Sequence, residues 1–241
     1  MASEYLKKKY RDVKPDEKRE LTPAEKRKNW WYYHKWHIVI GIVLLAIPIS
    51  ILWTALHQVK PDYQIAYIAS NALPDDTAAA MEAGFAALGE DLNGDGRVVV
   101  RLSQYSSAAS GLGAETVISS SVRLMADLTE CESYFFLLED PEQFQQSYGT
   151  LRRLDGSLPE EGEGASIEET CLLWSQCPVL AGMELGEYSY PLMGEAASGD
   201  SGELVSGLYI GRRGFWTDKT SANPEGCDAL WEKIVEGAVI S

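Results

Sequence analysis

The most informative stretch for the fold is YFFLLEDPEQFQQSYGTL, residues 134–151. Its first five residues form a continuous apolar run, as expected of a central strand that is buried on both faces of a sheet. The segment DPEQ at 140–143 is a capping box, and Phe144, Tyr148 and Leu151 follow on one side of a short helix. A buried strand that leads directly into a helix predicts one unit of an α/β domain.

Two similar strand–helix units come before this one. They comprise strands at 64–70 and 97–103 and helices at 75–88 and 115–128. Ile118, Val122 and Met125 align on one face of the second helix. The alternation of strands and helices predicts a mainly parallel sheet with right-handed crossovers, in a three-layer α/β domain.

The C-terminal half of the sequence is less regular. Residues 155–170 contain six acidic residues and no basic one, so we expect a solvated loop there. Strand-like stretches at 187–192 and 204–216 flank a Gly/Ser-rich tip at 194–203, and Asn223-Pro224 caps a final helix.

A long apolar segment precedes the domain. No Lys, Arg, Asp or Glu occurs from residue 36 to residue 59, and residues 38–56 would span ~28 Å as a helix, close to the ~30 Å hydrocarbon core of a bilayer. A cleaved signal peptide would need a much shorter charged region before the apolar core. We therefore predict one uncleaved transmembrane helix, a signal anchor, at 37–57.

The charges predict the orientation of this helix. Residues 1–36 carry eleven Lys/Arg and six Asp/Glu, a formal charge of +5, whereas residues 37–241 carry ten and thirty, a formal charge of −20. By the positive-inside rule, the basic tail at 1–36 is cytoplasmic and the domain at 58–241 is extracellular, at the plasma membrane. The acidic domain argues against nucleic acid as a partner, because it repels phosphates.

The basic tail contains a helix start signal. Residues 22–25, TPAE, form a capping box with proline at the first helical position. We expect the helix to begin near Pro23 and to run into the membrane, and residues 1–21 to be disordered.

The domain has almost no stalk, because the first predicted strand begins a few residues after the apolar segment. We therefore expect the domain to lie close to the bilayer. This favours a membrane-proximal protein partner, in addition to the lipid that surrounds residues 37–57.

Two stretches resemble known proteins. The strand–helix–strand opening followed by FFLLEDPEQFQQSYGTLRRLDGSLPE is similar to the first lobe of extracellular solute-binding proteins, in which a strand ends in an acid, a helix follows and the segment closes with Leu-x-x-Leu-Asp. TPAEKRKNWWYYHKWHIVIGIVLL resembles the N-terminal segment of uncharacterised membrane-anchored proteins of Gram-positive bacteria. The resemblance covers roughly residues 22–156 and 208–236 and implies one binding lobe held at a membrane.

Histidine is confined to His34, His37 and His57, at the edges of the apolar segment. Its absence from residues 58–241 excludes Ser-His-Asp and Cys-His nucleophile systems and histidine-ligated metals there. No pair of carboxylates stands out as a hydrolase pair. We expect a domain that is not an enzyme and has no catalytic residues.

The segment DLNGDG at 91–96 matches the first half of a D-x-[DN]-x-[DN]-G calcium loop. Asp91, Asn93 and Asp95 would supply side-chain oxygens and Arg97 its carbonyl oxygen to Ca²⁺. The closing bidentate Glu is missing, so we expect at most weak binding. The alternative is a plain helix-to-strand turn in which glycines supply φ > 0.

The loops after the three predicted strands share one edge of the sheet. They bring together Ser70, Asn71, Gln104, Ser106 and Glu139. Ligands of open α/β sheets bind at the carboxyl ends of the strands, so these residues are the predicted ligand site. The alternative is that they only cap helices.

All four cysteines follow the apolar segment: Cys131, Cys171, Cys177 and Cys227. The even number permits two disulfides, with Cys171 and Cys177 as the most local pair. Free buried thiols are the alternative.

The sequence thus predicts a membrane-anchored extracytoplasmic binding or sensing domain. The alternative is an envelope scaffold or accessory subunit that contacts another membrane protein and binds no small molecule. A deep cavity at the edge of the sheet marked by Ser70, Gln104 and Glu139 would favour binding, and a flat apolar patch would favour a scaffold.

Overall fold

The computed structural model describes residues 22–56, 59–107, 113–159, 166–191, 196–214 and 223–238. The chain divides into two compact units, residues 1–58 and residues 59–241. The prediction of disorder in the basic tail concerns residues 1–21, which lie outside the described residues.

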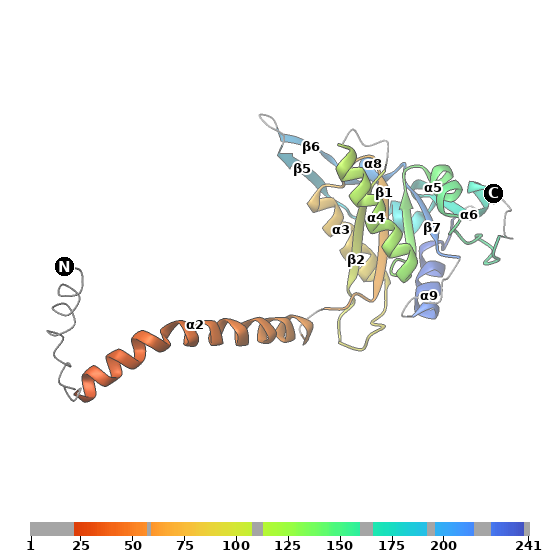
Figure 1. The fold of residues 1–241 in the computed structure, drawn as a ribbon. Coiled ribbons are helices and arrows are strands. Elements are labelled where there is room, and N and C mark those ends of the chain that lie inside the picture. Colours follow the sequence, from red (N-terminus) through yellow and green to blue (C-terminus); the bar gives the residue numbers. More distant parts are fainter. Residues whose placement is uncertain are drawn as a thin grey trace, which may run out of the picture. The chain divides into compact units, whose positions relative to one another are not determined.

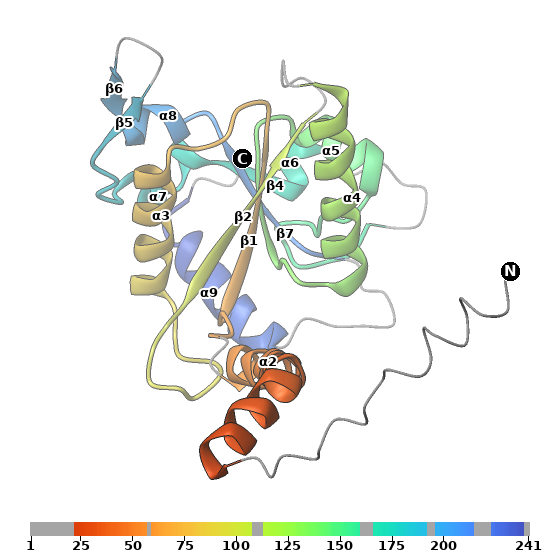
Figure 2. The same ribbon diagram turned by 60° about the vertical axis from the view of Figure 1, so that its left-hand side comes forward.

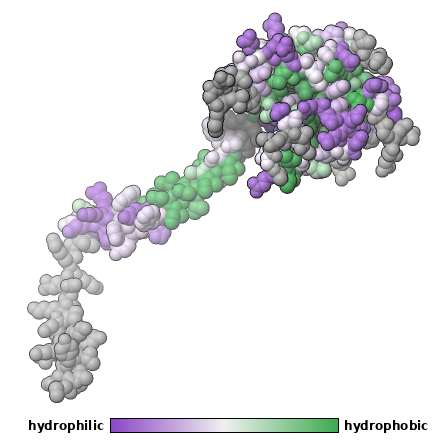
Figure 3. Space-filling view, turned by 90° about the horizontal axis from the view of Figure 1, so that it is seen from above, coloured by the Kyte–Doolittle hydropathy of each residue, from purple (hydrophilic) through white to green (hydrophobic). Residues whose placement is uncertain are grey.

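The described part of the first unit is one helix, α2 (Pro23–Leu56). It begins at the predicted capping box, where the Thr22 N–H donates to Glu25 Oε2 at 2.9 Å and the Glu25 N–H donates to Thr22 Oγ1 at 3.4 Å. Among the described residues it is the one helix long and apolar enough to cross a membrane, over Pro23–Thr54. Its apolar side chains gather along the C-terminal part (Figure 3). The predicted start of the helix is confirmed.

The second unit alternates strands and helices over its first half (Figure 1). Its elements are β1 (Tyr63–Ala69), α3 (Asp75–Leu88), β2 (Val100–Ser106), α4 (Ala114–Glu130), β3 (Phe135–Leu138), α5 (Pro141–Tyr148), α6 (Ile167–Thr170), β4 (Cys171–Leu173), the 3₁₀ helix η1 (Trp174–Gln176), α7 (Pro178–Ala181), β5 (Glu187–Pro191), β6 (Ala196–Asp200), α8 (Ser201–Val205), β7 (Tyr209–Arg212) and α9 (Pro224–Ile234). The three predicted strand–helix units are confirmed as element types.

Five of these strands form a sheet in the order β2-β1-β3-β7-β4. β1 pairs in parallel with β2 and with β3, whereas β7 is antiparallel to β3 and to β4. Four of the five strands therefore run in one direction, and the sheet is mostly parallel. β5 and β6 pair in a separate antiparallel hairpin.

The direction of winding reverses at β1. The chain moves from β1 through α3 to β2 on one side, and then returns through α4 to β3 on the other side. Because such crossovers are right-handed, α3 and α4 cover opposite faces of the sheet, as Figure 2 shows. The strand order reverses between the carboxyl ends of β1 and β3, which is the position where open α/β sheets bind ligands.

Alternate residues of β3 supply the cores on the two faces. Phe135 and Leu137 belong to the cluster beneath α3 and α9, where Trp231 stacks on Phe135 with ring centroids 6.4 Å apart. Phe136 and Leu138 belong to the cluster beneath α4 and α5. Burial on both faces explains why this strand is continuously apolar.

The C-terminal half contains more regular structure than the sequence predicted. Helix α6 occupies the end of the expected loop at 155–170, and β6 with α8 occupies most of the expected tip at 194–203. In the hairpin, Tyr188 lies against Gly199, where an added Cβ would be 2.9 Å from the tyrosine hydroxyl. Glycine therefore permits a close approach within a strand here, although Gly and Ser usually indicate turns.

Strand β2 begins later than predicted and forms an edge of the sheet. The Val99 N–H donates to the side chain of Asp62, 2.8 Å from Oδ2, and the Val99 carbonyl accepts the N–H of Tyr63, the first residue of β1, at 3.3 Å. Further along, the Leu102 N–H donates to Glu82 Oε1 at 2.8 Å and the Ser106 N–H donates to Ser120 Oγ at 2.7 Å. Side chains from α3 and α4 thus occupy backbone donors that an edge strand would otherwise leave open.

Helix α4 exposes the face that the sequence aligned. Ile118, Val122 and Met125, which we call the apolar stripe, are 62, 64 and 54 % exposed in that order. The face that packs on the sheet carries instead Ser120, Leu124, Asp127 and Leu128. Apolar spacing alone would indicate the wrong buried face, because the face that packs on the sheet is partly polar and its polar side chains find hydrogen-bond partners in other elements.

Candidate functional site

A serine and a glutamate join the carboxyl ends of β1 and β3. Ser70 follows β1 and Glu139 follows β3, at the point where the strand order reverses. The Ser70 N–H and hydroxyl both donate to the Glu139 carboxylate, the hydroxyl at 2.6 Å from Oε2. The two strand ends are thus held together by a charge-assisted pair of hydrogen bonds.

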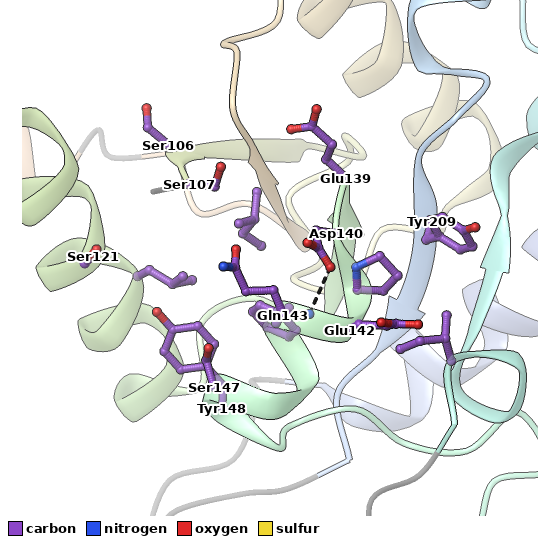
Figure 4. Close-up of a pocket in the computed structure, with 15 residues that line it drawn as sticks. Ser106, Ser107, Ser121, Glu139, Asp140, Glu142, Gln143, Ser147, Tyr148 and Tyr209 are labelled. Atoms are coloured by element: carbon purple, nitrogen blue, oxygen red, sulfur yellow. Dashed lines mark hydrogen bonds between the residues drawn. The ribbon is translucent and has the colours of Figure 1, made fainter. Parts of the chain in front are cut away.

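A pocket of about 600 Å³ opens beside this pair, between α4 and α5 (Figure 4). Ser106 and Ser107 line it at the end of β2, and Ser121 lines it from α4. The junction of β3 and α5 forms its central wall, and Tyr209 contributes from β7. The pocket therefore draws on several parts of the chain, β1 and α6 included, that meet at the carboxyl edge of the sheet.

Local capping fixes the central wall. The Gln143 N–H donates to Asp140 Oδ1 at 2.9 Å, and Pro141 occupies the first turn of α5. The predicted capping box is confirmed in this respect. Phe144 is buried one turn later, with its ring centroid 5.1 Å from that of Phe136. The short helix is therefore anchored at its start and along one side, which positions Gln143 and its neighbours at the pocket.

A buried polar cluster supports the α4 wall from behind. Asp127 accepts hydrogen bonds from the Tyr105 hydroxyl at 2.7 Å and from the Ser133 N–H and hydroxyl at 2.8 and 2.6 Å. The Arg213 guanidinium lies 3.7 Å from the same carboxylate. Burial, together with the bond to Asp127, raises the pKa of Tyr105 far above its usual value. The tyrosine thus stays a neutral donor, and α4 is held to β2 and to the residues that precede β3 and follow β7.

The pocket is acidic and rich in hydroxyl groups. Glu139, Asp140 and Glu142 line it, and among the residues that the structure describes no Lys, Arg or His does. Figure 4 shows Ser121 on one side, Tyr209 on the other and Asp140 between them. Such a lining offers hydrogen-bond acceptors, aromatic rings and negative charge to a small molecule.

The predicted ligand residues separate into two groups. Ser106 and Glu139 line the pocket, and Ser70 is bonded to Glu139 beside it. Gln104 Oε1 accepts the Leu73 N–H at 2.9 Å and does not line the pocket. Asn71 does not line it either, and its carbonyl accepts the Tyr67 hydroxyl.

The position of Gln104 follows from the pleat of the sheet. It pairs with Tyr67, which packs in the core beneath α3, so its side chain lies on that face of the sheet. Ser106 reaches α4 through its backbone at the end of the strand, where its N–H donates to Ser120 Oγ. Sequence reasoning placed the loops at the correct edge of the sheet but did not assign side chains to its faces. Binding through the predicted residues stays a prediction.

Several lining residues were missed. Ser121, Gln143 and Tyr148 come from helices that the sequence predicted, and the capping box at the start of α5 was a signal that Gln143 lies near the edge. Tyr209 comes from β7, more than sixty positions after α5 in the chain. No local pattern connects it to this edge, because β7 joins β3 only through long-range pairing.

The predicted calcium ligands, Asp91, Asn93, Asp95 and Arg97, lie in a tight loop. Asp91 Oδ1 and Oδ2 accept the N–H groups of Gly94 and Gly96, each at 2.7 Å. The hydrogen bond from Gly96 is the main cause that holds the pKa of Asp91 below its usual value. Both glycines have φ > 0, at 76° and 84°, as the turn reading required.

Side chains also close the rest of this loop. Asn93 Oδ1 accepts the Asp95 N–H and Asp95 Oδ1 accepts the Arg97 N–H, both at 2.9 Å. Asp62 accepts the N–H groups of Leu92 and Asn93 from outside the loop. Within the described ranges, no group of three or more His, Cys, Asp or Glu could hold a metal ion. Calcium binding stays a prediction, and side-chain oxygens from within and outside the loop already hold its backbone.

All four cysteines are buried, and none of them forms a disulfide. Burial raises the pKa of Cys171 to about 12 and that of Cys177 to about 11. Of the two alternatives that the sequence left open, the structure has the buried thiols and not the disulfides. Cys177 and Cys227 are packed in the core beneath α3, and Cys171 in the core beneath α4. They act there as small apolar residues.

No protein-family model, curated protein or solved structure matches this chain. The resemblance to a lobe of solute-binding proteins therefore stays a hypothesis. Function is argued below from the fold, the pocket and the charges of this chain.

Proposed function

We propose that the second unit is a non-catalytic ligand-binding or sensing domain that α2 anchors in the plasma membrane. The observation that carries this proposal is the pocket at the carboxyl edge of the sheet, where the strand order reverses. Ligands of open α/β sheets bind at this position. The proposal agrees with the resemblance to one lobe of extracellular solute-binding proteins.

The orientation across the membrane rests on charge. The basic residues before the apolar part of α2 and the acidic domain after it favour a cytoplasmic N-terminus and an extracellular domain. A reporter that works only outside the cell should be active when it is fused after Ser241. Activity of the same reporter fused at residue 10 instead would contradict this orientation.

The size and lining of the pocket support a small-molecule ligand. Its volume of about 600 Å³ lies within the ~300–1,000 Å³ typical of such sites. Tyr148 and Phe144 supply apolar surface, and serine hydroxyls and carboxylates supply polar contacts around it. A non-catalytic role rests on the histidine-free sequence of the domain, which lacks the usual general base for a serine or cysteine nucleophile.

Two serines of α4 allow a matched test. Ser121 lines the pocket and Ser119 does not; both are exposed. Their hydroxyls also make equivalent bonds, each 2.9 Å from a backbone carbonyl of the preceding turn. Ser121→Trp should fill the pocket, whereas Ser119→Trp adds the same side chain elsewhere on the same helix.

The assay is the retention of small molecules from growth medium by the full-length protein in detergent, measured by mass spectrometry. We expect a compound that the wild type and Ser119→Trp retain and that Ser121→Trp loses. Equal retention by all three proteins, or none, would contradict a ligand in this pocket. Equal melting temperatures of the two variants would show that both remain folded.

A second candidate function is favoured by the apolar stripe of α4. Three large apolar side chains at helical spacing are exposed on one surface, which is typical of a contact site for another protein. This supports the alternative of a scaffold or accessory subunit. A photo-crosslinking residue at Val122 should then trap one defined membrane protein in cells, and the same residue at Ser119 should not. Identical crosslinks from both positions would remove this alternative.

A further inference from the structure

The charge of the pocket is not balanced by its surroundings. Its three carboxylates, from Glu139, Asp140 and Glu142, meet no basic side chain in the part of the lining that the structure describes. The N-terminus of α5 opposes them, but a helix terminus carries only about half an elementary charge. The lining therefore keeps a net charge of about −2.5, which repels anionic ligands and attracts cations.

The carboxylates differ in how far they are already satisfied. Glu139 accepts both donors of Ser70, and Asp140 Oδ1 accepts the Gln143 N–H. The described residues supply no hydrogen-bond donor to Glu142, which is exposed at the pocket. Ionised carboxylates only accept hydrogen bonds, so a ligand that completes this set must bring donors, and charged donors make the stronger bonds.

The arrangement suits an extended organic cation better than a metal ion. In Figure 4 the side chains of Glu139 and Glu142 lie on opposite sides of Asp140 and do not converge on one point. Across the described ranges no cluster of acidic, histidine or cysteine side chains is arranged for a metal. Tyr148 and Tyr209 add ring faces, which attract ammonium and guanidinium groups.

We propose that this pocket binds a small organic cation, an ammonium or guanidinium compound, with Glu142 as its main charged contact. The proposal rests on the binding function proposed above and adds the chemical class of the ligand. A neutral polyol could use the serine hydroxyls, but it would leave the excess negative charge unopposed.

The probes are three five-carbon compounds that differ only in their end groups: 1,5-diaminopentane, 1,5-pentanediol and glutarate. They are titrated calorimetrically, at fixed ionic strength, into the full-length protein in a nonionic detergent without sugar groups. We expect saturable binding of the diamine, and no binding of the diol or of glutarate at ten times the diamine concentration that half-saturates the protein.

Two charge-neutralising variants separate a local contact from the general field of the domain. Glu142→Gln removes a carboxylate of the pocket. Glu225→Gln removes an exposed carboxylate from α9, which packs on the opposite face of the sheet. Loss of one charge-assisted hydrogen bond corresponds to at least about tenfold weaker binding, so we expect this for Glu142→Gln and less than a twofold change for Glu225→Gln.

The outcomes separate this proposal from the binding function itself. Equal weakening by Glu142→Gln and Glu225→Gln would show only general attraction and would overturn the proposal. The proposal would also be overturned if the diol or glutarate bound and Ser121→Trp abolished that binding, or if the diamine did not bind at 10 mM. In either case, the retention experiment with Ser121→Trp would decide separately whether the pocket binds a different class of ligand. Diamine binding that Glu142→Gln and Ser121→Trp weaken, and Glu225→Gln does not, would support it.

Discussion

Val122→Ala and Leu124→Ala should have very different effects, although the two residues are neighbours on α4. Leu124 is 4 % exposed in the core beneath α4, so its truncation should lower the free energy of unfolding by about 2–3 kcal/mol. Val122 is 64 % exposed, so only about a third of a burial energy of ~1.5–2 kcal/mol, or ~0.6 kcal/mol, is at stake. Alanine regains about 0.5 kcal/mol through its higher helix propensity. The net change for Val122→Ala is therefore close to zero.

Urea unfolding of the full-length protein in nonionic detergent measures both values. Trp174 and Trp231 are buried in the core beneath α3, so their fluorescence reports unfolding of the second unit. The urea midpoint should move clearly for Leu124→Ala and should hardly move for Val122→Ala, at an unchanged slope.

Two results would refute the orientation of α4. A loss above about 1.5 kcal/mol for Val122→Ala would place the apolar stripe in the core, as its spacing alone suggests. A loss below about 1 kcal/mol for Leu124→Ala would remove that residue from the core. Either result would also remove the basis for the stripe as a contact surface.

Three further predictions concern the interior, the thiols and acid stability. Asp127→Ala should lower the free energy of unfolding by about 3–5 kcal/mol, because it leaves Arg213 buried without its carboxylate. In urea titrations, adding Arg213→Met should recover part of this loss, and additive losses of the two variants would contradict the coupling. At pH 8 only about one in a thousand Cys177 side chains and one in ten thousand Cys171 side chains are thiolate. Ellman's reagent should therefore label neither cysteine until denaturant is added, and rapid labelling of the folded protein would argue against their burial. Because the pKa of Asp91 is lowered in the folded state, its carboxylate stabilises above its unfolded pKa of about 4 and this contribution is lost as the pH falls through the folded value. The stability difference between wild type and Asp91→Asn should therefore shrink from pH 6 to pH 2 in urea titrations, and a difference that grows on acidification would show the sign to be wrong.

The parts of the fold that the sequence predicted correctly are specified by residues close together in the chain. The capping box at Thr22 and the one at Asp140 each act within one helical turn, and the structure contains both sets of contacts. The run of apolar residues in β3 is also a local signal, since each face of that strand meets its own core. Such local patterns predict structure correctly because their interpretation depends on no distant residue.

The buried face of α4 could not be predicted in the same way. Asp127 is buried because Tyr105, Ser133 and Arg213 surround it, and they come from three other parts of the chain. A carboxylate on a helix normally indicates solvent, so the spacing of apolar residues pointed to the opposite face. Only the positions of these three partners, which the sequence does not give, show that hydrogen bonds and a positive charge compensate for the burial of the Asp127 carboxylate.

The sequence indicated the edge of the sheet at which the pocket lies, but not the residues that line it. Parallel strands bring their carboxyl ends to one edge, so Ser106 and Glu139 were expected there. The same logic could not assign Gln104 to the core side of the sheet or bring Tyr209 to the pocket, because both depend on pairing between strands.

The side chains that cover the edge of β2 affect how the sheets of neighbouring copies can pair. A chain held at a membrane, as proposed, diffuses in two dimensions and meets copies of itself often. An open row of backbone donors on each copy would let one sheet template the next, and such contacts would grow into linear polymers. Glu82 and Ser120 occupy two of these donors, so a second copy would have to displace them before it could pair. At the proposed membrane location, this edge of the sheet would therefore offer fewer open donors to a neighbouring copy.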